Sequence, residues 1–277
     1  MSASDPNSHL SNDELLSMTK DLDALHHDVT LPALKTSLSE WADDIRTRAA
    51  AGEEDEELPR SFLDRRKFLV GASGLAGVGL LAACSSSGSG TPKSSPSASS
   101  GAMAGGEGQK LSGDLQVVAM AASLENSGIA TYQAGIKAAT AGKLGPVPPA
   151  VMTFAETAMA QHEDHQKAWN AVLTAAGKRP VTAADPAIQP AINTALDKVT
   201  NVTGLAELAL MVENVAGETY QNGLTVIKSA AGIKTAASIQ PVEFQHAAIL
   251  SFVLGKYPVP SAFTGVSSAR PPTDYQT

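Results

Sequence analysis

Apolar residues recur every three or four positions through most of residues 110–256, which is the spacing of helices that pack on one another. We expect four long helices, over residues 111–142, 149–176, 205–231 and 235–254. Gly177 follows the second of them, where a glycine often ends a helix, and Gly232 follows the third. The longest connection is 178–204. Two short hairpins joined by one longer crossover connection predict an all-α four-helix bundle.

Prolines shape the end of this region. Pro241 lies inside the fourth expected helix, so either Ser238 caps the helix and Pro241 lies in its first turn, or the helix is kinked. Residues 257–277 contain several further prolines and are expected to form an extended tail.

The first 63 residues show a separate helical pattern. Ser11 and Glu14 have the spacing of a capping box, and leucines follow at helical intervals. A second helix is expected from Pro32, so that residues 1–63 form an acidic helical arm, a hairpin that packs weakly or binds a partner. The neighbouring His26 and His27 do not share a helix face, which argues against a metal site there.

A short segment over residues 64–84 has a different character. Arg65 and Arg66 precede an apolar run over 68–83, which is shorter than the ~20 residues of a membrane span. Leu81-Ala82-Ala83-Cys84 closes the run and resembles the lipobox of bacterial lipoproteins. This resemblance implies export by the twin-arginine machinery and a lipid on Cys84, and therefore a location in the cell envelope, on the outer face of the cytoplasmic membrane.

Several alternatives for this segment remain open. The stretch before Arg65 is long and acidic, whereas the start of a signal peptide is short and basic, so either the true start lies downstream of Met1 or the arm stays in the cytoplasm. If Cys84 is not processed, the uncleaved apolar segment could anchor the chain in the membrane. It could also be a buried helix rich in glycine and alanine. Residues 85–109 are rich in Ser, Gly and Pro, which predicts a flexible linker between this segment and the bundle.

Composition and charge then narrow the classes of function. Residues 1–83 carry fifteen acids and eight bases, a net of −7, and residues 84–277 carry thirteen acids and twelve bases, a net of −1. Neither part has the basic excess of a nucleic-acid binder, so nucleic acid is excluded as a partner. The single cysteine excludes an intramolecular disulfide.

An internal repeat lies within the expected bundle. Glu125–Gly135 (ENSGIATYQAG) and Glu213–Gly223 (ENVAGETYQNG) are identical at six of eleven positions. A His-containing element follows each copy, His162-Glu163-Asp164-His165 after the first and Glu243-Phe244-Gln245-His246 after the second. The repeat suggests two helical hairpins that present metal ligands on their inner faces.

Helical spacing explains why these residue types suit a metal. Residues three apart lie on one face, so Glu243 and His246 can reach one point, and His162 and His165 can do the same. All the histidines of residues 110–256 fall in these positions. Buried and unpaired, Glu125 or Glu213 would be costly among their apolar neighbours, which favours a shared counter-charge. Carboxylates and imidazoles together suit iron, manganese or zinc.

Residues 110–255 resemble the ferritin-like superfamily, in particular exported bacterial ferritin-like domain proteins. The resemblance gives Glu125 and Glu213 the single-Glu positions, Glu243 and His246 the Glu-x-x-His positions, and His165 the remaining His position. His162 departs from the pattern, because the family has Glu there. The resemblance implies one or two metal ions, iron or manganese first and zinc as another choice. If the protein is an enzyme, it implies a metal-dependent oxidoreductase acting on iron, oxygen or peroxide.

Other roles stay open at this stage. Tyr132 and Tyr220 share a helix face with Glu125 and Glu213, and could hydrogen-bond to the ligands, take part in radical transfer or pack in the core. The bundle could also be a metal-free scaffold for an envelope protein partner, and a homodimer is a further option. No separate catalytic residue stands out.

Overall fold

The computed structural model describes residues 11–52, 109, 111–259 and 264–271. Within these residues the chain is helical, with no strand. The elements are α1 (Asn12–Leu25), the π-helical turn η1 (His26–Thr30), α2 (Leu31–Ala50), α4 (Asp114–Thr140), α5 (Pro149–Ala175), α6 (Gln189–Leu196), α7 (Val202–Gly223) and α8 (Ala230–Val253). The prediction of an all-α fold is therefore confirmed.

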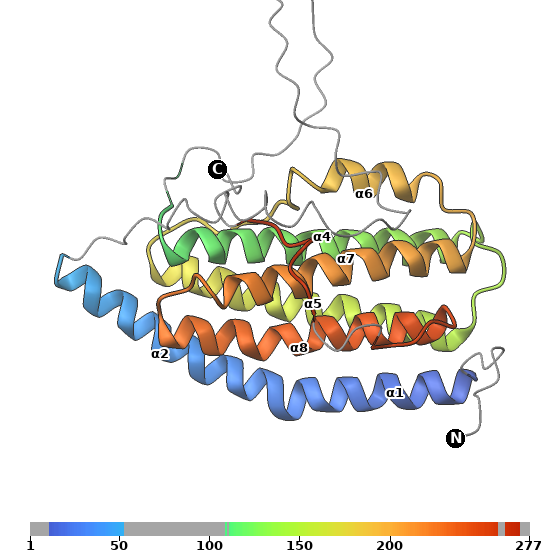
Figure 1. The fold of residues 1–277 in the computed structure, drawn as a ribbon, viewed down its shortest axis with the longest axis horizontal. Coiled ribbons are helices and arrows are strands. Elements are labelled where there is room, and N and C mark those ends of the chain that lie inside the picture. The colour runs from blue at the N-terminus through green and yellow to red at the C-terminus, as the bar shows by residue number, and fades with distance from the viewer. Residues whose placement is uncertain (1–10, 53–108, 110, 260–263, 272–277) are drawn as a thin grey trace, which may run out of the picture.

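Two helical hairpins form the bundle. Helix α4 packs along α5, and α7 packs along α8, while the crossover between the hairpins carries the short helix α6 against α7 (Figure 1). One apolar cluster lies around Trp169 at one end of the bundle, and a second lies around Phe154 at the other. Between the two clusters, each of the four long helices carries buried polar residues. The functional site therefore lies in a polar layer between two apolar ends.

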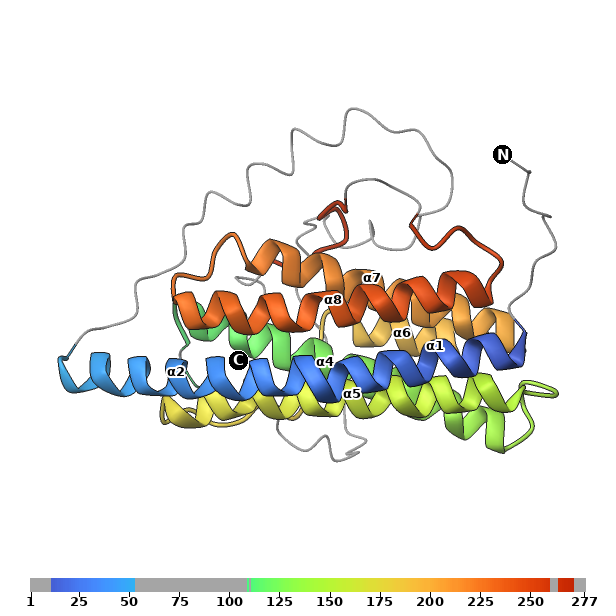
Figure 2. The same ribbon diagram turned by 90° about the horizontal axis from the view of Figure 1, so that it is seen from below.

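Residues 12–50 form one continuous helical run instead of the expected hairpin. The run lies across α5 and α8, as Figure 2 shows from below. The predicted capping box is confirmed, because Ser11 Oγ accepts the N–H of Glu14 and the Glu14 carboxylate accepts the N–H of Ser11. Pro32 cannot donate a backbone hydrogen bond, and the π-helical turn directly before it lets the chain continue without a break.

The packing of this arm is tight. Leu15, Leu22, Leu34 and Trp41 are buried, and each such side chain contributes about 1.5–3 kcal/mol relative to exposure. A Cβ on Gly232 would lie 2.8 Å from the Trp41 ring, so this glycine lets α2 and α8 approach each other closely. The expectation of weak packing is wrong, because the arm packs against α5 and α8 of the bundle as a fifth long helix.

The boundary between the third and fourth bundle helices differs from its prediction. Helix α7 ends at Gly223 and α8 begins at Ala230, so Gly232 lies in the first turn of α8. The buried carboxylate of Asp114 accepts the backbone N–H groups of Lys228 and Ser229, at 2.9 and 2.8 Å. This long-range contact from the start of α4 holds the connection in a turn, and the local sequence does not show it.

Pro241 lies inside α8, which is capped by Ser229. Ser238 is not the cap, because its Oγ donates to the carbonyl of Lys234 within the helix. Pro241 is exposed, so the carbonyl that its missing N–H leaves unpaired can be hydrated. At the end of α5, Gly177 has φ 67°, which confirms the predicted glycine at the helix end.

Hydrogen bonds hold the crossover and the C-terminal segment on the bundle. The Asn126 side-chain amide donates to the carbonyls of Val181 and Ala183, which fixes the crossover on α4. Residues 264–271 run back along α7, where Glu218 Oε2 accepts the N–H of Ser268 at 2.6 Å. No helix among the described residues is long and apolar enough to cross a membrane.

The predicted export and lipid segment lies outside the described residues. This applies to Arg65, Arg66 and Cys84, and to the linker over 85–109 except Gln109. Their predicted roles remain predictions.

Candidate metal centre

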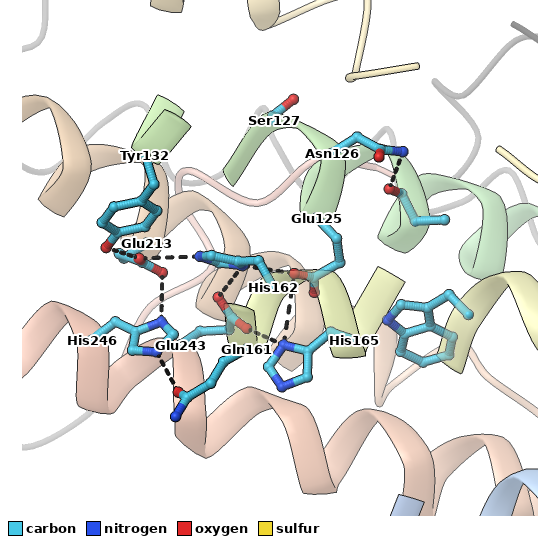
Figure 3. Close-up of polar contacts among 12 residues, drawn as sticks. Glu125, Asn126, Ser127, Tyr132, Gln161, His162, His165, Glu213, Glu243 and His246 are labelled. Carbon is cyan, nitrogen blue, oxygen red and sulfur yellow. Dashed lines mark hydrogen bonds and ion pairs between the residues drawn. The ribbon is translucent and has the colours of Figure 1, made fainter. Parts of the chain in front are cut away.

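The polar layer contains every metal ligand expected from the sequence. Each of the four bundle helices contributes, and each side chain is at most 1% exposed: Glu125 from α4, His162 and His165 from α5, Glu213 from α7, and Glu243 and His246 from α8. Figure 3 shows the six side chains pointing toward one another. Helical spacing places the ligands of each helix on one face, and the packing of the four helices brings these faces together.

One ligand group lies on the side of the arm. It consists of Glu125, His162, His165 and Glu243, whose ligand atoms lie within 4.8 Å of one another. His162 Nδ1 is 2.7 Å from Glu125 Oε2, and His165 Nδ1 is 3.0 Å from Glu243 Oε1. Two carboxylates and two imidazoles therefore face one position.

A second group overlaps the first. It consists of His162, Glu213, Glu243 and His246, again with ligand atoms within 4.8 Å. His162 Nε2 is 3.3 Å from Glu213 Oε1, and His246 Nδ1 is 3.4 Å from Glu213 Oε2. The two groups share His162 and Glu243, so the site offers two adjacent metal positions with common ligands.

The two tyrosines of the repeat cross over between its copies. Tyr132 on α4 donates its O–H to Glu213 on α7, and Tyr220 on α7 donates to Glu125 on α4. Tyr220 occupies Oε1 of Glu125 and leaves Oε2 to His162 and His165, whereas Tyr132 shares Oε1 of Glu213 with His162. Each hydrogen bond holds the carboxylate in its rotamer. The repeat therefore builds a two-fold arrangement in which each copy orients the ligand of the other.

Gln161 belongs to the site but was missed in the sequence. Its Oε1 lies 2.8 Å from His246 Nε2 and accepts the proton on that nitrogen, which leaves Nδ1 of His246 to face Glu213. Gln161 precedes His162 and lies four residues before His165, so it shares the ligand face of α5. Its position at that spacing was the signal that could have identified it.

His26 was also missed, and it comes from the arm. Its ring lies 5.2 Å from the His165 ring, and its Nε2 is 3.6 Å from Asp164 Oδ2. Its side chain is 1% exposed, and neither ring nitrogen makes a hydrogen bond within the described residues. Burial and the neighbouring His165 lower the pKa of His26 to about 4, so the ring is neutral at pH 7. The arm thus closes the site behind His165.

The carboxylates and the imidazoles shift each other's pKa in opposite directions. Burial alone would raise the pKa of Glu125, but His165 and His162 outweigh it and lower the value to about 2. Burial alone would lower the pKa of His165, but Glu125 raises it to about 9. The pKa of His162 is likewise raised well above its usual value by Glu243 and Glu213 against the effect of burial. Protons on the imidazoles therefore neutralise the buried carboxylates when no metal is bound.

Glu243 stands apart from the other two carboxylates. Its burial, followed by the nearby charge of Glu125, raises its pKa. Within the described part of the chain neither of its oxygens makes a hydrogen bond, although Glu243 is completely buried and belongs to both ligand groups. The nearest cation to it is the His165 imidazole, at 3.0 Å from Oε1, and a buried carboxylate without hydrogen bonds is costly. The donor set and this carboxylate fit a metal ion.

A comparison with known protein families matches the same part of the chain that carries the ligand groups. Residues 113–256 match the profile of the ferritin-like domain. No curated protein and no solved structure matches the chain. The helical arm over residues 12–50 lies outside the matched range, whereas all six ligand positions lie within it. The chain belongs to the ferritin-like domain family.

Proposed function

We propose that this protein binds one or two redox-active metal ions at the polar layer and reacts them with oxygen or peroxide. The observation that carries the proposal is the pair of overlapping buried ligand groups, which share His162 and Glu243. Carboxylates with imidazoles suit iron and manganese, and zinc is a further candidate.

The ligands have distinct roles in this proposal. Glu125 and Glu213 each bind at one position, oriented by the tyrosine of the opposite repeat copy. Glu243 belongs to both ligand groups and could serve either position. His165 and His246 would complete the two positions, and Gln161 holds the tautomer of His246. The complete burial of the ligands excludes bulk water, which strengthens every electrostatic interaction within the layer.

His162 is the position that sets the number of ions. An imidazole in place of a carboxylate removes one negative charge from the site, so two divalent ions are less well neutralised. We therefore expect one ion to bind tightly and the second weakly. A bound iron or manganese ion would supply one-electron transfer to oxygen or peroxide. The residues of this chain supply the coordination geometry and hold the protons of Tyr132 and Tyr220 at the carboxylates.

Metal analysis of the full-length chain tests the proposal. The protein is stripped with a chelator, loaded without oxygen with Fe(II), Mn(II) or Zn(II), desalted and analysed for metal. We expect at least one equivalent to be retained, and Glu156→Ala serves as a matched control, since this acidic residue of α5 is exposed and away from the site. Retention of about 0.1 equivalents or less with all three metals would contradict the proposal.

A metal-free polar core is the second candidate, and one observation favours it. His162 lies between Glu125 and Glu213 and already neutralises them when protonated. In that case the protein is a non-catalytic scaffold. Glu125→Ala combined with His246→Ala would then leave its cellular role intact, whereas the metal-binding protein would lose it.

We also propose that the protein lies in the cell envelope, based on the sequence of residues 64–84. The packed arm adds a condition: residues 12–50 and the bundle must lie on the same side of any membrane. Cleavage before Cys84 would leave the arm attached by non-covalent contacts alone. Mass spectrometry of the membrane-associated protein should find a lipid on an N-terminal Cys84. A chain that still begins at Met1 would contradict lipidation and favour an uncleaved anchor.

A further inference from the structure

Three aromatic side chains connect one metal ligand to the arm. Tyr220 donates its O–H to Glu125, and Trp169 Nε1–H donates to Tyr220 Oη at 2.6 Å. The rings of Trp169 and Tyr220 are stacked at 5.8 Å, and those of Trp169 and Trp41 meet edge to face at 6.2 Å. Aromatic rings at ~4.5–7 Å are in van der Waals contact, so the chain Tyr220–Trp169–Trp41 is continuous.

The other copy of the repeat has no such continuation. Tyr132 donates to Glu213, but its aromatic neighbour on the far side is Phe154, at 6.3 Å. Phenylalanine has no polar hydrogen and is much harder to oxidise than tryptophan or tyrosine. The two equivalent tyrosines therefore differ in whether an oxidisable neighbour follows. Moreover, Trp41 and Trp169 are the only two tryptophans of the chain, and both belong to this one path.

The outer end of the path comes from the arm. Trp41 lies on α2, outside the ferritin-like domain, and is itself 1% exposed. Its neighbours on α2, Glu40 and Asp44, line a surface hollow of about 490 Å³ together with Lys234 of α8. Trp41 does not itself line the hollow, but Glu40 next to it in α2 does, and so does Ala231, the neighbour of the Gly232 that its ring contacts. The path thus runs from the buried ligands to a buried ring beside a surface hollow.

We propose that Tyr220, Trp169 and Trp41 carry one electron from the arm to the metal centre while peroxide is reduced there. This inference rests on the proposed function. Hydrogen peroxide needs two electrons and two protons to form two molecules of water. A bound ferrous ion would supply one electron on becoming ferric, and Trp41 supplies the second and becomes a radical cation. The O–O bond breaks to give two molecules of water, and with the two protons the reactants and the products each carry four positive charges.

The transfer proceeds in steps along the contacts. Tyr220 gives up an electron, and its hydroxyl proton moves along the hydrogen bond to Glu125. Trp169 then returns an electron to Tyr220, which recovers its proton, and Trp41 returns one to Trp169. Glu40 and Asp44, on the same helix as Trp41, line the surface hollow, where Glu40 is paired with Lys234. A small reductant such as ascorbate finally reduces Trp41. Because peroxide receives two electrons by this route, it is reduced to water. Reduction by a single ion alone would supply one electron and release a hydroxyl radical.

Radical trapping and peptide mapping test the path. The full-length protein is loaded with Fe(II), mixed with hydrogen peroxide without reductant and frozen for electron paramagnetic resonance. Parallel samples are digested, and oxidised tryptophan is located by mass spectrometry. We expect a tryptophan radical and oxidation products at Trp41. In Trp169→Phe and Tyr220→Phe the Trp41 signal should fall to the background of the metal-free protein, and spin-trapped hydroxyl radical should increase.

Two further variants keep the result unambiguous. Tyr132→Phe is the matched control from the other repeat copy and should leave the Trp41 signal at the wild-type level. Trp41→Phe changes no residue of the ferritin-like domain itself and should shift the oxidation to Trp169. Equal oxidation of Trp41 in Tyr132→Phe, Tyr220→Phe and Trp169→Phe would overturn the path, as would the absence of any Trp41 oxidation in iron-loaded protein. Protein that retains no metal overturns the proposed function together with this inference, so iron is quantified in every sample.

Discussion

The two hairpins of the bundle are copies of one ligand plan, but they have diverged around it. Each contributes a single glutamate and a tyrosine that hydrogen-bonds to the glutamate of the other copy. Helix α5 then offers His162 and His165, where α8 offers Glu243 and His246. The arm packs on both α5 and α8, but its buried His26 lies against His165 of α5. The shared parts hold the ligands, and the differing parts set charge and access.

In the first hairpin, Gly128 and His162 both differ from their counterparts in the second, Ala216 and Glu243. A Cβ on Gly128 would lie 2.9 Å from the His162 ring, so the glycine makes room for it. The equivalent position of the second copy is Ala216. The imidazole carries a proton in the metal-free protein, whereas a carboxylate would add negative charge. The comparison teaches that His162 is accommodated by its surroundings. In the proposed function, the same residue weakens the second metal position.

Making the two hairpins alike should have the largest effect. In His162→Glu both carry Glu-x-x-His, so we expect the second metal ion to bind much more tightly. In Glu243→His both carry His-x-x-His and the bridging carboxylate is lost, so affinity should fall by more than the roughly 10–100-fold typical of an outer hydrogen-bonding partner. Competition with a chelating dye and metal analysis measure both. Two equally tight ions in the wild-type protein would contradict the assigned role of His162.

Most of the bundle follows from its sequence, for a physical reason. Helical periodicity and the break at Gly177 are local signals, and they placed α4 and α5 within a few residues. The turn before α8 was misplaced because Asp114, far away in the chain, holds it. The arm was expected to pack weakly, and it does not. The Trp41 ring packs directly over Gly232 of α8, a close approach that only the fold reveals.

The site, like the fold, could be predicted where the signal is local and could not where it depends on contacts between distant parts of the chain. The ligand positions could be read from the repeat, because helices convert spacing into a common face. The crosswise hydrogen bonds of Tyr132 and Tyr220 could not, since the sequence gives no register between α4 and α7. Gln161 is one of many polar residues on a helix until His246 is placed opposite it. His26 lies more than a hundred residues before its neighbour His165, so no local pattern connects them.

The two tyrosines offer the next test of the difference between the copies. Tyr220→Phe leaves Glu125 without its O–H donor and Trp169 Nε1–H without its acceptor, whereas Tyr132→Phe removes the donor to Glu213 alone. We expect the metal-free protein to lose about 2–3 kcal/mol with Tyr220→Phe and about 1–2 kcal/mol with Tyr132→Phe. Urea unfolding followed by circular dichroism measures both. Equal losses would mean that the Trp169 hydrogen bond contributes nothing.

His26 should make the arm sensitive to acid. Its pKa is lowered to about 4 in the folded protein, so between pH 6.5 and 4 the unfolded chain binds more protons at this residue. Its contribution to stability is therefore complete above pH 6.5 and is lost as the pH falls toward 4, by about 3 kcal/mol. His26→Phe keeps a ring and removes this loss. Urea unfolding of metal-free protein at pH 7 and pH 4.5 should show the stability difference between the two proteins growing toward acid. Parallel curves would contradict the assignment.

The smallest effect concerns the space beside His162. Gly128→Ala brings a methyl group against the His162 ring and should cost about 1 kcal/mol. The flexible side chain in His162→Glu can move away, so in that background the alanine should gain helix propensity instead. Ala216→Gly is the matched change in the second copy and should cost about 1 kcal/mol in either background. Unfolding of the four combinations of Gly128→Ala and His162→Glu gives the coupling energy. If the two changes are additive, the glycine was not required by the imidazole, and the divergence of the two hairpins in space and in charge would be independent events.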